Sequence, residues 1–102
     1  MEKLYEYSIP ELVHLLGERF KDYRMRMQMT QKEMAEHTGL TITTIHKFEN
    51  GITNNMSLGT FLLLLKGIDQ IESLNELLPE LPISPYLIKK EKKVQRIRHK
   101  KS

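Results

Sequence analysis

The chain has 102 residues, 39% hydrophobic and 28% charged, with a formal net charge of +3, a composition typical of one ordinary globular domain with a modest core. Its longest uninterrupted apolar run covers only residues 61–65, which excludes a membrane-spanning helix. Because the chain contains no cysteine and no apolar signal core follows Met1, disulfides and thiolate metal sites are excluded and we expect a cytoplasmic protein.

The first predicted helix runs from Ser8 to Met27. Ser8 and Glu11 have the spacing of a capping box, and Pro10 is tolerated because it falls in the first turn. Residues 24–29 alternate in a way that would suit a strand, but an apolar stripe at helical spacing favours the helix. The stripe is formed by Val13, Leu16, Phe20 and Met27.

Two short helices are predicted next, joined by a tight corner. Thr30 and Glu33 form a second capping box, and the helix that they begin ends before Gly39, which suits a left-handed backbone position. The following helix, Thr41 to Phe48, is capped by the hydroxyl of its first residue and terminated by Asn50-Gly51. This arrangement is a helix-turn-helix, whose second member can enter the major groove of DNA.

The helical wheel of residues 41–49 separates a buried face from an exposed face. Ile45, Phe48 and Glu49 lie together on the wheel, so they form the predicted core face. The residues that point away, and are therefore the candidate readers of DNA, are Thr43, His46 and Lys47, with Ile42 at the edge.

Two charged residues fall on predicted core faces. Glu49 lies on the apolar face of its helix, and Arg24 lies on the apolar stripe of the first helix. Because an unpaired buried charge is strongly destabilising, we predict a bidentate structural ion pair between Arg24 and Glu49. The alternative is that both side chains reach water at frayed helix ends.

The next predicted helix begins at Ser57, which can cap it, and continues to about Ile68. A shorter helical piece follows over about residues 70–78, after which prolines turn the chain extended. The core stripe of the longer helix is predicted to contain Leu58, Phe61, Leu62, Leu65 and Ile68.

The helix of residues 57–68 is apolar around most of its circumference, which one small core cannot bury. We therefore predict a homodimer, whose two-fold axis presents two recognition helices to DNA half-sites. The predicted interface contains Leu63, Leu64, Ile71 and Leu74. The alternative is that the proline-containing segment or residues 4–7 fold back over this surface.

The chain divides into a DNA-binding domain, residues 8–78, a proline-containing linker or docking segment, residues 79–88, and a basic tail, residues 89–102. Between Lys89 and Lys101 the tail holds eight Lys and Arg residues and one Glu, so it favours the phosphates of nucleic acid or of an anionic membrane surface. The alternative is a merely solvated tail, and we expect the free tail to be disordered.

Three segments carry a family resemblance, namely Gly17-Glu-Arg-Phe, residues 29–40 and residues 44–51, which end in Glu-Asn-Gly. At this spacing the chain resembles the Xre/Cro/cI family of lambda-type repressors over about residues 10–68. The resemblance implies an all-α, lambda-repressor-like bundle of about five short helices. It also implies a sequence-specific transcriptional repressor that binds double-stranded operator DNA.

The resemblance assigns roles to single residues. Gln31 resembles the phosphate-binding and helix-bracing glutamine of the family, and Asn50 resembles the residue that touches the DNA backbone after the recognition helix. Arg24 and Glu49 occupy the positions of the family's buried ion pair. We assign base contacts to Ile42, Thr43 and Lys47, and backbone contacts to Gln31, Thr41, Thr44, His46 and Asn50.

The chain departs from the family at three positions. Ile42 and Thr43 stand where many members have Gln, Arg or Ser, so direct readout is predicted to depend on methyl contacts to thymine and on Lys47 reaching guanine. Thr38 replaces a residue that is usually apolar in the family, and we expect it to loosen the turn slightly.

Within the family, the chain is most similar to HipB-type antitoxins at Tyr7-Ser8, Phe48-Glu-Asn, residues 57–61 and Leu64-Leu65. This resemblance implies the autorepressor of a toxin–antitoxin operon, with a HipA-type serine/threonine kinase as a partner. The alternatives are an antitoxin that acts mainly by binding the kinase, a plain phage-type repressor, and an RNA-binding or ribosome-associated protein that uses the basic tail.

The sequence gives little support for catalysis. Its four histidines are scattered, and neither a glycine-rich phosphate loop nor a nucleophile elbow is present. We therefore expect no catalytic residues, no metal, no cofactor and no membrane partner.

Overall fold

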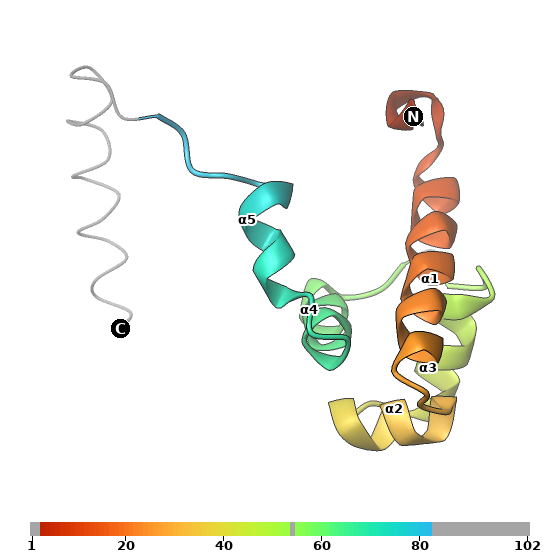
Figure 1. Cartoon of the computed structure of the whole chain (residues 1–102). Coiled ribbons are helices and arrows are strands. Elements are labelled where there is room, and N and C mark those ends of the chain that lie inside the picture. Colours follow the sequence, from red (N-terminus) through yellow and green to blue (C-terminus); the bar gives the residue numbers. More distant parts are fainter. Residues whose placement is uncertain (1–2, 54, 83–102) are drawn as a thin grey trace.

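The computed structural model describes residues 3–53 and 55–82 (Figure 1). These residues form α-helices and short 3-10 helices and contain no strand, so the prediction of an all-α fold is confirmed. The elements in chain order are η1 (Leu4–Glu6), α1 (Ile9–Arg26), α2 (Gln31–Thr38), α3 (Ile42–Glu49), α4 (Leu58–Gly67), η2 (Ile71–Ser73) and α5 (Leu74–Leu77). The predicted basic tail, and the linker beyond residue 82, lie outside the described residues.

The four longer helices begin at the predicted cap residues. These caps are Ser8, Thr30, Thr41 and Ser57, and each side-chain oxygen accepts the backbone N–H three residues later. At Ser8 and Thr30 the capping box is complete, because Glu11 and Glu33 accept the backbone N–H of the cap. The bonds from Ser8 also lower the pKa of the Glu11 carboxyl below its usual value.

Each of these helices is followed, within two residues of its end, by a residue in the left-handed backbone conformation. Two are glycines, Gly39 and Gly51, and two are the non-glycine residues Gln28 and Asp69, each with φ of 59°. After α1, the Met29 N–H bonds to the carbonyl of Arg24 at 3.3 Å and the Gln28 N–H to that of Met25 at 2.9 Å, the pattern of a Schellman motif. Gln28 adopts this conformation against the steric cost of its Cβ.

Replacing Gln28 by glycine is expected to raise the free energy of unfolding by about 1 kcal/mol, because glycine adopts a positive φ without that cost. Lys21→Gly is the control, since Lys21 is an exposed residue inside α1, where glycine lowers stability by about 1 kcal/mol. Urea unfolding followed by circular dichroism measures both changes. A Gln28→Gly variant that unfolds at lower urea than the parent would contradict the strain argument.

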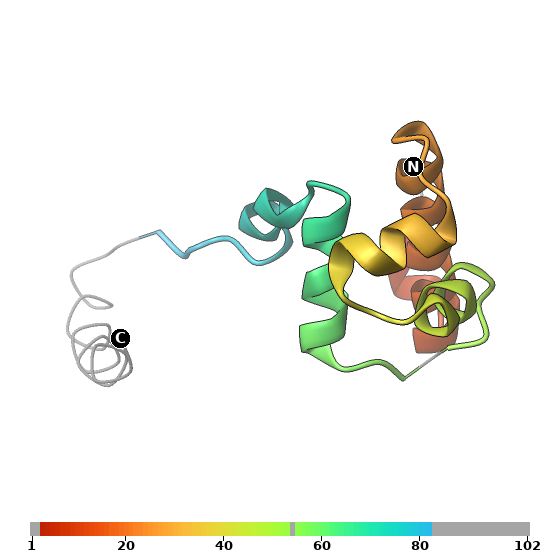
Figure 2. The same cartoon turned by 90° about the horizontal axis from the view of Figure 1, so that it is seen from below.

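The core lies where α1, α2, α3 and α4 meet (Figures 1 and 2). It consists of Phe20, Met34, Ala35, Ile45, Phe48, Leu64 and Ile68. Phe48 is central, because its ring lies 5.6 Å from that of Phe20 and 6.4 Å from that of Phe61, centroid to centroid, in tilted and edge-on geometry. Helix α3 therefore connects α1 to α4 through one aromatic side chain.

Two glycines set how closely the helices approach. A Cβ on Gly17 would lie 1.9 Å from the carbonyl oxygen of Phe48, so α1 contacts the backbone of α3 directly. A Cβ on Gly67 would lie 2.5 Å from the side chain of Thr38, so α4 packs closely on α2. The helices consequently pack in the order α1, α3, α2, α4.

The predicted core stripe of α4 is partly wrong. Leu64 is fully buried in the core of its own domain, so its assignment to a dimer interface is corrected, whereas Leu58, predicted to be in the core, is 71% exposed. The physical reason is that Phe61, Leu64, Leu65 and Ile68 follow the i, i+3, i+4, i+7 spacing of one helix face, which the core occupies. Leu63, on the opposite side of α4, is 42% exposed.

The ends of the described chain do not cover α4. Helix η1 lies beside the N-terminus of α1, and the side chain of Tyr5 is fully exposed (Figure 1). The predicted helical piece of residues 70–78 is divided into η2 and α5, and residues 79–82 have no regular structure. Both figures place α4 between α5 and α1.

Candidate nucleic-acid interface

The corner between α2 and α3 has the geometry expected of a helix-turn-helix. Gly39 has φ of 78°, and its N–H bonds to the carbonyl of Ala35 at 2.9 Å, which ends α2 in an αL motif. Two residues later the Thr41 hydroxyl accepts the backbone N–H of Thr44 at 3.1 Å and begins α3. The chain therefore changes direction within three residues.

Thr38 makes side-chain hydrogen bonds at this corner, and the expectation that it loosens the turn stays a prediction. Its hydroxyl donates to the carbonyl of Met34 at 2.8 Å and accepts the N–H of Leu40 at 3.3 Å. An apolar residue would provide neither bond, and the last carbonyls of α2 would lose a donor. The threonine thus adds hydrogen bonds at the corner, while its methyl group packs against Gly67.

Helix α3 has one buried face and one exposed face. Ile45, Phe48 and Glu49 are each at most 4% exposed. The opposite face is open, since Thr43, His46 and Lys47 are exposed and Ile42 is 47% exposed. Thr44 is half-buried beside the cap. The exposed face offers methyl groups near the start of the helix and a cation near its end.

Arg24 and Glu49 form the bidentate ion pair that the helical wheel predicts. The Nε of Arg24 donates to Oε2 of Glu49 at 2.6 Å, and Nη2 donates to Oε1 at 2.9 Å. The hydrogen bonds to Glu49 raise the pKa of the Arg24 guanidinium. Both residues are buried, at 8% and 4% exposure, so the pair ties α1 to α3 inside the domain.

Two further groups join this pair. The Nη1 of Arg24 donates to the carbonyl of Met29 at 2.7 Å, and the amide nitrogen of Gln31 donates to Oε1 of Glu49 at 3.0 Å. The network therefore connects α1, the turn before α2, α2 and α3. No buried side-chain nitrogen or oxygen in residues 3–53 and 55–82 lacks a partner, so the charges are fully compensated there.

The model of the helix-turn-helix domain family matches residues 15–71, more than half of the chain. The chain belongs to this helix-turn-helix family. The match covers the network and the whole of α2, α3 and α4. No curated protein matches the chain. A helix-turn-helix domain of this kind is typical of DNA-binding regulators.

In this helix-turn-helix domain, Gln31 links the buried network to the protein surface. One N–H of its amide bonds to Glu49, and the second N–H of the same group is left for an acceptor such as phosphate. Gln31 is half-buried at the start of α2. The helix-bracing role that the resemblance implies is therefore present as a hydrogen bond. The remaining N–H is a donor that suits the implied phosphate-binding role.

Asn50 caps the end of α3. Its amide nitrogen donates to the carbonyl of His46 at 2.8 Å and lies 3.3 Å from Nδ1 of the same residue. With this nitrogen engaged, the group that Asn50 presents to solvent is its amide oxygen, which does not bind phosphate. Contact with a DNA backbone would require the side chain to rotate.

Sequence reasoning missed two parts of the site. Nothing in the sequence indicates that the Met29 carbonyl is a partner of Arg24, because every residue has a backbone carbonyl. Gly17 did carry a signal, since a glycine inside a helix costs about 1 kcal/mol and usually has a packing reason. That reason is the backbone of Phe48.

Neither a metal-binding group nor a membrane-spanning helix is found in the described part of the chain. No three His, Asp or Glu residues gather there into a group that could hold a metal ion. None of its helices is long and apolar enough to cross a membrane.

Proposed function

We propose that the protein is a sequence-specific transcriptional repressor that binds operator DNA as a homodimer, with α3 in the major groove. The exposed face of α3, projecting beyond the corner at Gly39, is the observation that carries this proposal. The network around Glu49 supports it, because a reader helix must keep one orientation relative to the rest of the domain.

The exposed groups divide into proposed base contacts and proposed phosphate contacts. Ile42 and the methyl of Thr43 fit the C5-methyl of thymine, and the ammonium of Lys47 fits the acceptors of guanine. Each such contact contributes about 1–3 kcal/mol of discrimination against the wrong base. The proposed contacts to phosphates come from Gln31, Thr41, Thr44 and His46. Asn50 is proposed to join them after its side chain rotates away from His46.

Lys47→Ala is expected to relax the preference for guanine at one operator position by about tenfold and to weaken specific binding. Thr43→Ala is expected to relax the preference for thymine at another. The measurement is gel-shift titration on the DNA upstream of the protein's own gene and on single-base variants of the bound site, at two salt concentrations.

Two controls accompany this titration. Lys66→Ala removes the same charge from an exposed site on α4 and should leave the base preference unchanged. Gln31→Ala should weaken binding to all sequences alike, because a phosphate contact carries no base information. Equal losses on every sequence for Lys47→Ala would argue against base readout by α3.

The proposed homodimer is supported by apolar surface left on the monomer. Leu63 is 42% exposed, and Ile71 and Leu74 are half-buried. A two-fold axis would place two copies of α3 on half-sites about one DNA turn apart.

The finer proposal is that the repressor is the antitoxin of a HipBA-like operon and binds a HipA-type kinase. It rests on the resemblance at Tyr7-Ser8, residues 57–61 and Leu64-Leu65. Expression of the whole operon with only this chain tagged is expected to co-purify an untagged kinase encoded beside it. Purification of the chain without that protein, together with tight operator binding, would favour a plain phage-type repressor.

A further inference from the structure

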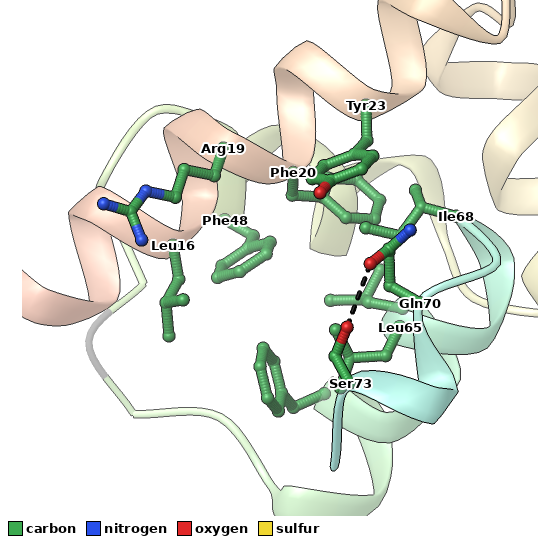
Figure 3. A pocket seen from close by; sticks show the side chains of 11 residues that line it. Leu16, Arg19, Phe20, Tyr23, Phe48, Leu65, Ile68, Gln70 and Ser73 are labelled. Atoms are coloured by element: carbon green, nitrogen blue, oxygen red, sulfur yellow. Dashed lines mark hydrogen bonds between the residues drawn. The ribbon is translucent and has the colours of Figure 1, made fainter. Parts of the chain in front are cut away.

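An apolar hollow lies between α1 and the end of α4 (Figure 3). We call it the cup. Its walls include Leu16 and Tyr23 on α1, Phe61 and Leu65 on α4, and Ser73 of η2, and its volume is about 240 Å³. The Ser73 hydroxyl bonds to the side-chain oxygen of Gln70 at 2.9 Å, which fixes one edge of the cup.

The cup follows from the close approaches at the two glycines. Gly17 brings α1 onto α3, and Gly67 brings α4 onto α2. Helices α1 and α4 are therefore held chiefly by different neighbours, and Phe48 packs between Phe20 of α1 and Phe61 of α4 at the base of the space between them. The cup is thus a consequence of how the whole domain packs.

The rim of the cup on α1 carries charges of both signs, with Arg19 and Arg26 exceeding Asp22 by one. Arg19 lines the cup, and it also lines a second hollow of about 310 Å³ together with Asp22, Tyr23 and Arg26. The two hollows share Arg19 and Tyr23, so they are neighbours along one face of α1. A ligand that fills the cup with an apolar group would therefore lie beside two arginines and one aspartate.

Residues 74–82 form an arm that is apolar and acidic. Leu77, Leu78 and Leu81 are 67%, 86% and 71% exposed. The arm carries Glu76 and Glu80 and no basic residue. Helix α5 packs chiefly on η2, and both views show it on the side of α4 away from α1 (Figures 1 and 2). The leucines of the arm are therefore exposed to solvent, and α1 of the same chain does not cover them.

We propose that the arm of one chain seats its leucines in the cup of a second copy, and that the second arm is exchanged in return. This inference rests on the proposed homodimer and adds a second pair of contact surfaces to the one around Leu63. A two-fold interface must be self-complementary, and this chain holds both halves, an apolar cup beside two arginines and one aspartate, and an apolar arm with acidic residues. Exchange buries the exposed leucines and brings the acidic residues of the arm near the two arginines.

Cross-linking of introduced cysteines tests the contact directly, because the parent chain has none. One variant carries Tyr23→Cys in the cup and another carries Leu78→Cys in the arm. A short bismaleimide added to an equal mixture is expected to join the two variants into a product of twice the 12.1 kDa chain mass. In the control mixture Lys32→Cys, at an exposed residue of α2, replaces Tyr23→Cys. This mixture should give no such product.

A chain carrying both Tyr23→Cys and Leu78→Cys separates exchange from folding back. Exchange predicts cross-linked dimers at low protein concentration. A cross-link within one monomer would show that the arm covers its own cup, and the absence of any cross-link would show that the arm and the cup do not meet. Either result overturns the proposal.

Complementation between variants gives a second test. Leu78→Glu damages only the arm, and Tyr23→Glu adds negative charge only to the cup, so each variant alone is expected to raise the dimer dissociation constant tenfold or more, about 1.4 kcal/mol. An equal mixture should recover dimers, because one intact cup then meets one intact arm. Leu58→Glu, at an exposed leucine on the far end of α4, should leave the dimer unchanged.

These measurements keep the two proposals apart. Analytical ultracentrifugation reports the dimer without DNA, and gel shifts report operator binding. If neither Leu78→Glu nor Tyr23→Glu changes the dimer dissociation constant, arm exchange is overturned and the repressor proposal stays intact. A parent chain that forms arm-dependent dimers but binds no operator would overturn the repressor proposal while supporting arm exchange.

Discussion

Arg24→Met is expected to lower the free energy of unfolding by about 3–5 kcal/mol. Without Arg24, the Glu49 carboxylate stays 4% exposed and keeps only the amide of Gln31 as a partner among the groups described above. The Met29 carbonyl also loses its donor. The cost arises from a buried charge left uncompensated, which is larger than the net contribution of the intact pair. Urea unfolding monitored by circular dichroism measures the change.

Two further variants identify the cause. Arg26→Met removes an exposed arginine two residues along the same helix and should change stability by no more than about 0.5 kcal/mol. The double variant Arg24→Met with Glu49→Met should regain much of the loss, because no isolated charge remains. If the double variant were less stable than Arg24→Met alone, the loss would come from packing of the two side chains and not from the uncompensated carboxylate.

Gly17→Val is expected to be the second most damaging substitution, lowering the free energy of unfolding by about 3 kcal/mol. The Cβ position lies 1.9 Å from the carbonyl oxygen and 2.9 Å from the carbonyl carbon of Phe48. Both are backbone atoms of α3, so no side-chain rotation relieves the clash and α1 must move away from α3. The displacement would also stretch the bonds between Arg24 and Glu49.

Gly59→Ala provides the matched control for Gly17. Gly59 lies in the first turn of α4, and no heavy atom lies within 4 Å of its Cβ position. Alanine there should raise stability by up to about 1 kcal/mol through helix propensity alone. Gly17→Ala has the same propensity gain and should still destabilise, so opposite signs at the two positions measure the clash. The same sign at both positions would contradict a rigid contact between α1 and α3.

The helix boundaries could be predicted because they depend on contacts within a few residues. The hydroxyls of Ser8, Thr30 and Thr41 accept N–H groups three residues away, and such bonds form whatever packs around the helix. The Arg24–Glu49 pair was also predictable, because a charge on an otherwise apolar helix face requires a partner.

The core face of α4 could not be predicted in the same way. A helical wheel assigns faces by contrast between polar and apolar residues, and the run of residues 61–65 offers none. Leu64 fills the core and Leu58 faces solvent because α4 rests on α2 through Gly67, which fixes its rotation. That contact joins residues far apart in the chain.

The sequence by itself determined the local structure of this protein, namely where its helices begin and end, the left-handed corner at Gly39 and the outward face of α3, because hydrogen bonds and steric limits between near neighbours suffice for these. Only the tertiary structure decided which leucines are buried, how Met29 and Gln31 complete the ion pair, and where the cup lies. Those features depend on the distance between helix axes, which Gly17 and Gly67 set through contacts with distant residues.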